Sequence, residues 1–141
     1  MVIEFELTDN PYVTTQEKGI NWRARSVYEK HEVRAMKDEY KTRIRQYLRA
    51  NGLEVPRLEG TVALKVCFYF KTIDRRSWGC LKETKPDNDN AVKGLQDCLA
   101  DLGFFHSGDQ QVADLHVLKF WASSARVRIE SEEVRRDLFR T

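Results

Sequence analysis

The alternation that decides the fold lies between residues 61 and 71, which read TVALKVCFYFK. Apolar side chains occupy every second position: Val62, Leu64, Val66, Phe68 and Phe70. Successive side chains of a β-strand point to opposite faces of a sheet, so this segment is predicted to be a half-buried strand. Residues 2–7 repeat the pattern, with Ile3, Phe5 and Leu7 separated by two glutamates.

Two amphipathic helices are predicted, one before and one after the strand at 61–71 in the sequence. Residues 28–50 place apolar side chains at spacings of three and four: Val33, Met36, Tyr40, Ile44 and Tyr47. That spacing gives one buried stripe, and Asn51-Gly52 suits the left-handed residue that ends a helix. Residues 90–102 carry a second stripe and are followed by Gly103.

The rest of the chain is assigned from alternation and turn residues. Residues 111–121 and 125–130 are predicted to form a hairpin, and residues 131–140 a short terminal helix. Residues 8–27 are predicted to be irregular, and residues 72–86 a basic loop. The order β-α-β-α-β-β favours an α+β fold with a mixed sheet, and we expect residues 1–141 to form one domain.

Composition excludes several classes of protein. The 24 basic and 22 acidic side chains leave a net charge of +2, so bulk charge alone does not indicate a nucleic-acid binder. Three cysteines without a C-x-x-C spacing argue against a disulfide framework or a zinc site and favour a reducing, cytoplasmic setting. No apolar run approaches the roughly 18 residues of a membrane span.

Residues 85–93, which read KPDNDNAVK, contain the most informative chemistry. Asp87 and Asp89 are two residues apart, and in an extended segment such side chains point to the same side. Two carboxylates at one point repel each other unless a cation lies between them. Mg²⁺ suits such a site, because it commonly binds through one or two carboxylates plus substrate phosphate. Lys93, about one helical turn after Asp89, is placed to contact that phosphate.

Asp109 is a candidate third carboxylate. The helix at 90–102 is about 20 Å long at about 1.5 Å per residue, and the seven residues 103–109 span at most roughly 25 Å. Asp109 therefore returns to the first two aspartates only if the chain doubles straight back. This tight geometry leaves open a site completed across a subunit interface.

Each of these residues also has an ordinary structural explanation. A D-x-D pair before a helix often only caps it, with negative charge favoured by the helix dipole. Taken singly, Asp109 suits a turn, and Lys93 suits a solvated helix face together with Asp97 and Asp101. The tryptophans suit packing, although Trp78, in a polar loop, is also a candidate for base stacking. The basic loop favours phosphate binding more strongly, through Arg75, Arg76, Lys82 and Lys85.

The stretch from Lys85 to Val112, taken whole, resembles the RusA family of Holliday junction resolvases. The family pattern is a D-x-D-N pair, a lysine, an aspartate and a leucine along a helix, Gly-Phe-aromatic, and then an aspartate and Gln-Val. The matching residues are Asp87, Asp89, Asn90, Lys93, Asp97, Leu99, Gly103, Phe104, Phe105, Asp109, Gln111 and Val112. Together these residues form a specific motif, although no single one of them is specific.

The resemblance implies a homodimer, encoded by a bacterium or phage, that binds four-way DNA junctions and cuts two strands symmetrically with Mg²⁺. It also implies that Asp87, Asp89 and Asp109 bind the metal and that Lys93 is catalytic. Two alternatives stay open: a metal-dependent nuclease for other branched DNA, such as flaps or forks, and a non-enzymatic DNA-binding module in which the aspartates are caps. An RNA-binding protein is disfavoured, because no RNA-module signature is present.

Overall fold

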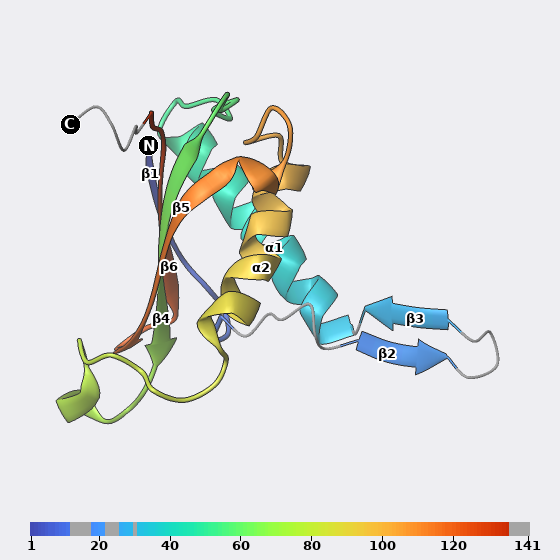
Figure 1. Ribbon diagram of the computed structural model, residues 1–141. Coiled ribbons are helices and arrows are strands. Elements are labelled where there is room, and N and C mark those ends of the chain that lie inside the picture. Colours follow the sequence, from blue (N-terminus) through green and yellow to red (C-terminus); the bar gives the residue numbers. More distant parts are fainter. Residues whose placement is uncertain (12–17, 22–25, 30, 136–141) are drawn as a thin grey trace.

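The computed structural model describes residues 1–11, 18–21, 26–29 and 31–135 (Figure 1). The strands of the main sheet are β1 (Val2–Glu6), β4 (Val62–Lys71), β5 (Val112–Ala122) and β6 (Arg126–Glu133). Two helices, α1 (His31–Ala50) and α2 (Asn88–Asp101), lie on the same side of this sheet. The predicted α+β fold with a mixed sheet and two main helices is therefore confirmed.

The strand order is β1-β6-β4-β5, and β4 is parallel to β5 but antiparallel to β6. The predicted hairpin of the last two strands is therefore wrong, because β4 lies between them. Two strand spacings amount to about 10 Å, a distance that the three residues 123–125 can span. The short connection was therefore compatible both with a hairpin of β5 and β6 and with the observed order, in which β4 lies between them. The parallel pair β4–β5 requires a crossover, and α2 supplies it.

The core lies between the helices and the inner face of the sheet. The predicted apolar positions of the central strand, Val62, Leu64, Val66, Phe68 and Phe70, are all buried. Val33, Tyr40, Ile44 and Leu48 cover them from α1, and Val92, Leu95, Cys98 and Leu99 from α2. Both helices therefore form because each buries an apolar stripe against the same sheet face.

Three local predictions differ from the structure. Residues 8–27 were expected to be irregular, but β2 (Lys18–Asn21) pairs antiparallel with β3 (Ser26–Glu29). The first helix consequently begins at His31, after β3. The predicted terminal helix at 131–140 is wrong over its first residues, because pairing with β4 continues to Glu133; residues 136–141 lie outside the described residues. None of the described helices is both long and apolar enough to cross a membrane.

Tyr40 gives a test of the core. Its side chain is fully buried beside Phe5, with ring centroids 6.3 Å apart, and its hydroxyl has no hydrogen-bond partner among the described residues. An unpaired buried hydroxyl costs roughly 1–3 kcal/mol. We therefore expect Tyr40→Phe to raise the free energy of unfolding by about 1 kcal/mol in urea denaturation. Tyr47→Phe, at a half-buried position of the same helix, is the control and should be neutral; a less stable Tyr40→Phe protein would mean that the hydroxyl is paired.

Candidate active site

The acidic turn, residues 87–89, forms the start of α2. Asp87 occupies the N-cap position with extended backbone angles (φ −66°, ψ 146°), and its carbonyl accepts a hydrogen bond of 2.9 Å from the Ala91 amide. Because the helix begins at Asn88, Asp89 is helical, and the expectation that both aspartates lie in one extended segment is wrong. The Asp87 carboxylate makes no capping hydrogen bond. Both aspartates are exposed, so their carboxylates face solvent rather than serving the fold.

Lys93, in the second turn of α2, is the centre of an ion-pair network. Its ammonium lies 2.9 Å from Asp109 Oδ2 and 3.0 Å from Asp97 Oδ1. Asp97 in turn lies 3.6 Å from the Lys37 ammonium on α1. The hydrogen bonds to Asp109 and then Asp97 raise the pKa of Lys93 above its ordinary value. Lys93 therefore stays protonated at neutral pH, in a position fixed from two sides.

Asp109 reaches this network through η2 (Asp109–Gln111), a short 3₁₀ helix directly before β5. The chain doubles back far enough for Asp109 to contact Lys93. Across residues 1–11 and 32–135, however, no three Asp, Glu, His or Cys side chains gather closely enough to hold a metal ion. One chain therefore pairs Asp109 with Lys93 but does not place it in one ligand cluster with Asp87 and Asp89.

The donor chemistry still suits a divalent cation. Mg²⁺ usually keeps several waters and takes only one or two protein carboxylates, the remaining ligands coming from substrate phosphate. Asp87 and Asp89 provide two such carboxylates, neither of which is used by a capping bond or an ion pair in the described residues. The residues of the acidic turn therefore fit a partial Mg²⁺ donor set, whereas the three aspartates do not form one ligand cluster among the described residues.

Two lysines hold the segment that leads into the acidic turn. The Lys82 ammonium donates hydrogen bonds to Thr84 Oγ1 at 2.6 Å and to the Lys85 carbonyl. The Lys119 ammonium, on β5, donates to the carbonyls of Thr84 at 2.6 Å and Pro86 at 2.7 Å. Both lysines therefore bind the backbone directly before Asp87.

The acidic turn itself is also tied to the sheet. The Asn88 side-chain amide donates to the Val117 carbonyl of β5 at 3.1 Å. This bond and those of Lys119 fix the start of α2 beside the middle and the carboxyl-terminal half of β5.

Comparison with known proteins identifies the family. The sequence matches the family described as Endodeoxyribonuclease RusA over residues 7–132, which is most of the chain. The chain belongs to the RusA endodeoxyribonuclease family.

Two similar proteins differ in how much of the chain they match. The "Crossover junction endodeoxyribonuclease rusA" of Lactococcus phage r1t is 29% identical over 131 residues, covering 93% of this chain and 96% of the phage protein. The "Uncharacterized protein YqaN" of Bacillus subtilis (strain 168) is 47% identical over 51 residues. That second match spans 36% of this chain and only 34% of the B. subtilis protein.

The basic side chains in the loop of this RusA family member differ in their exposure to solvent. Arg75 and Arg76 belong to the exposed 3₁₀ helix η1 (Arg75–Ser77), and the Lys85 side chain is also exposed. Lys82 differs, because the residue is only 7% exposed and its ammonium lies 4.9 Å and 4.8 Å from the ring centroids of Phe70 and Trp121. Burial, followed by the nearby charge of Lys119, lowers the pKa of Lys82. This placement does not favour the predicted contact between Lys82 and DNA phosphate.

Sequence reasoning missed three residues that organise this site. Asp97 was interpreted as a surface charge, although its i, i+4 spacing from Lys93 was a usable signal. Lys119 and Asn88 gave no signal, because their partners are backbone carbonyls of segments distant in sequence.

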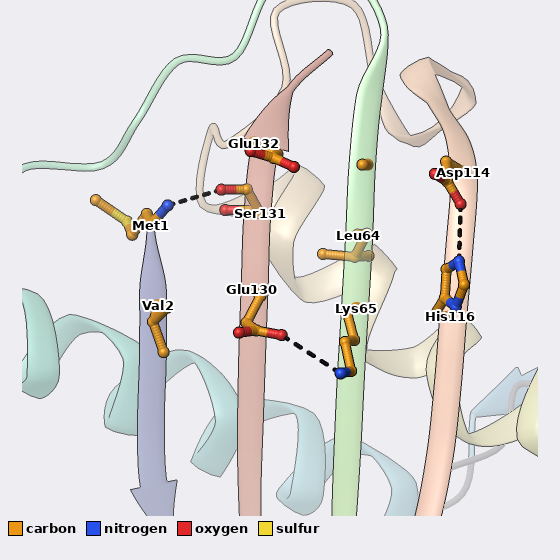
Figure 2. Close-up of a pocket in the computed structure, with 10 residues that line it drawn as sticks. Met1, Val2, Leu64, Lys65, Asp114, His116, Glu130, Ser131 and Glu132 are labelled. Atoms are coloured by element: carbon orange, nitrogen blue, oxygen red, sulfur yellow. Dashed lines mark hydrogen bonds and ion pairs between the residues drawn. The ribbon is translucent and has the colours of Figure 1, made fainter. Parts of the chain in front are cut away.

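The described residues also form a pocket on the main sheet. Figure 2 shows it on the sheet face turned away from the helices, where the Lys65 ammonium lies 3.9 Å from Glu130 and the His116 ring 3.1 Å from Asp114. Its lining includes none of the aspartates expected to bind metal. Asp87 and Asp89 are exposed and lie outside this pocket.

Lys82→Met tests the anchoring of the acidic turn. Methionine keeps a flexible apolar side chain between Phe70 and Trp121 but removes the hydrogen bonds to residues 84 and 85. Because small errors in position cost roughly 100-fold in rate, we expect DNA cleavage to fall by about tenfold to a hundredfold.

Amide hydrogen exchange at residues 84–89 of the same variant should accelerate while the melting temperature changes little. Lys65→Met, on the opposite sheet face, is the matched control and should behave like the wild type. Unchanged cleavage together with unchanged exchange in Lys82→Met would exclude the anchoring role.

Proposed function

We propose that this chain is a Mg²⁺-dependent endonuclease that resolves four-way DNA junctions by paired symmetric nicks, in DNA recombination and repair. The observation that supports this most is the contact of 2.9 Å between Lys93 and Asp109, which are 16 residues apart in sequence. It gathers an ammonium group and a carboxylate beside the acidic turn, on a surface open to a large substrate. The name of the phage relative supports the choice of junctions as substrate.

In this proposal Asp87 and Asp89 hold the divalent cation, and Asp109 is the third ligand. Mg²⁺ at this position would supply Lewis-acid activation of the phosphodiester and of a water nucleophile. Asp109 serves either within its own chain or across a subunit interface. A two-fold homodimer with two such sites matches the approximate two-fold symmetry of a four-way junction.

The remaining roles follow from charge and exposure. Lys93, kept protonated by its two aspartates, stabilises the negative charge that develops on the phosphate during cleavage. Arg75, Arg76 and Lys85 are exposed cations that contact flanking phosphates, so binding weakens as salt rises. Lys82 positions the acidic turn through its hydrogen bonds to Thr84 and Lys85.

The chemistry is tested with Asp87→Asn and Lys93→Ala on a synthetic four-way junction. Nicks are mapped with and without Mg²⁺, and junction binding is measured separately by gel shift. Loss of a preorganised electrostatic group costs about 100- to 1,000-fold in rate, so both variants should lose cleavage by at least that factor while they still bind the junction. Asp101→Asn, at the far end of α2 and paired with Lys41 at 2.9 Å, is the control and should cleave normally.

Several outcomes would redirect the proposal. Retained cleavage by either variant would reject the assigned roles. Faster cleavage of flaps or forks than of four-way junctions would keep the chemistry but change the substrate. Absence of Mg²⁺-dependent cleavage on every substrate would favour the DNA-binding module, although that alternative does not explain why the Asp87 carboxylate makes no capping bond.

Mixed subunits show where Asp109 acts. Asp87→Asn and Asp109→Asn chains are each expected to be inactive. If Asp109 completes the site of the other subunit, a mixed dimer contains one site with both mutations and one intact site, so mixing restores nicking of one strand. If Asp109 acts within its own chain, every site keeps one mutation and mixing restores nothing. A mixture of either variant with itself is the control.

A further inference from the structure

The loop between β4 and α2 exposes apolar side chains. Ile73 is 95% exposed and Leu81 is 65% exposed, the two largest values among the large apolar side chains that the structure describes. Trp78, in the same loop, is 41% exposed. Three exposed apolar side chains thus lie within the nine residues 73–81, and exposed apolar surface gathered in this way often marks a binding site.

This loop is held in one shape by the sheet. The amides of Thr72 and Gly79 donate to the carbonyls of Ala122 and Trp121 at 3.0 and 2.9 Å. The Lys82 amide donates to the Lys119 carbonyl at 2.9 Å. The loop is therefore anchored to the end of β5 at both of its ends, so it presents its apolar side chains in a preorganised way.

The turn around Ile73 is fixed as well. The Asp74 carboxylate caps η1, accepting from the Arg76 amide and the Ser77 hydroxyl, both at 3.1 Å. The Trp78 indole nitrogen donates to the Thr72 carbonyl at 2.9 Å, and the Arg75 guanidinium lies 5.7 Å from the Trp78 ring centroid. The hydrogen bond of Trp78 therefore helps to fix the turn, and Ile73 is its most exposed apolar side chain.

The surroundings of Ile73 favour DNA as the partner. Lys71, Arg75 and Arg76 lie within three residues of Ile73. Asp74, the one carboxylate in residues 70–76, caps η1 and also lies 3.3 Å from the exposed Arg76 guanidinium. Cations flanking a projecting aliphatic side chain match the way proteins wedge such a residue between base pairs while contacting the adjacent phosphates. A purely apolar protein partner would not need these cations.

The position of the loop connects it to the acidic turn. Figure 1 shows η1 and the start of α2 at the same end of the molecule, where β4 ends. Lys82 links them directly, because its backbone is anchored to β5 beside Leu81 while its ammonium binds the Lys85 carbonyl. Both segments therefore belong to one end of the fold, at which this inference places the branched DNA.

We propose that Ile73 is a wedge that inserts between base pairs at the branch point of the DNA substrate and unstacks them. This inference rests on the proposed junction-cleaving function, and it names the side chain that distinguishes a branch from continuous duplex. Base pairs at a branch point stack less securely than those inside a duplex, so the energy needed for insertion is lowest there.

The test uses a four-way junction with 2-aminopurine at the branch point, whose fluorescence rises when the base unstacks. Without divalent cation, so that no cleavage occurs, wild-type protein should raise the fluorescence severalfold, and Ile73→Ser should abolish most of the rise. Ile73→Phe should retain it, because a larger apolar side chain can also insert. Leu53→Ser, at another exposed apolar position (43%), is the matched control and should behave like the wild type.

The outcomes separate this inference from the proposed function. Ile73→Ser is also expected to lose at least tenfold in junction affinity while its affinity for linear duplex is unchanged. No fluorescence rise with bound wild-type protein, or equal rises with Ile73→Ser and wild type, would overturn the wedge while leaving the cleavage assay intact. A normal fluorescence response in a protein that fails to cut junctions with Mg²⁺ would support the wedge and reject the cleavage proposal.

Discussion

Parallel pairing of β4 with β5 is the constraint on which the rest of the structure depends. Parallel neighbours cannot be joined by a tight turn, so the chain must cross over the sheet, and α2 makes that crossing. The crossing consists of the loop at 72–86 and then α2, and the acidic turn at the start of α2 is bonded to β5 by Asn88 and Lys119. It also brings the chain back along α2 before β5 begins, so that Asp109 meets Lys93.

Positive charge then organises an acidic surface. Lys93 holds Asp109 and Asp97 from one side, and Lys82 and Lys119 hold the backbone before Asp87 from the other. Buried or half-buried lysines bound to backbone carbonyls support the fold internally, whereas the arginines of η1 are exposed, and we propose that they contact phosphate. Burial therefore distinguishes Lys82, which supports the acidic turn, from the exposed Arg75 and Arg76 of the same loop.

Local elements could be predicted from the sequence because their signals are local. Alternation in residues 61–71 and the apolar stripes of both helices gave strands and helices close to those observed. Strand order could not be predicted in this way, because the three residues 123–125 suit both a hairpin and a step over β4. The candidate site residues were predicted from spacing together with the resemblance to the RusA family. The support by Lys119 was not predicted, because hydrogen bonds to distant backbone carbonyls leave no pattern in the sequence.

The central claim is that the acidic turn holds a divalent cation against DNA phosphate. Anomalous diffraction from Mn²⁺, in crystals of the wild-type protein bound to a non-cleavable four-way junction, tests it most directly. The account predicts an anomalous peak within about 2.5 Å of carboxylate oxygens of Asp87 and Asp89, with a phosphate oxygen as a further ligand. Mn²⁺ bound only elsewhere, with both carboxylates facing solvent beside ordered DNA, would contradict it.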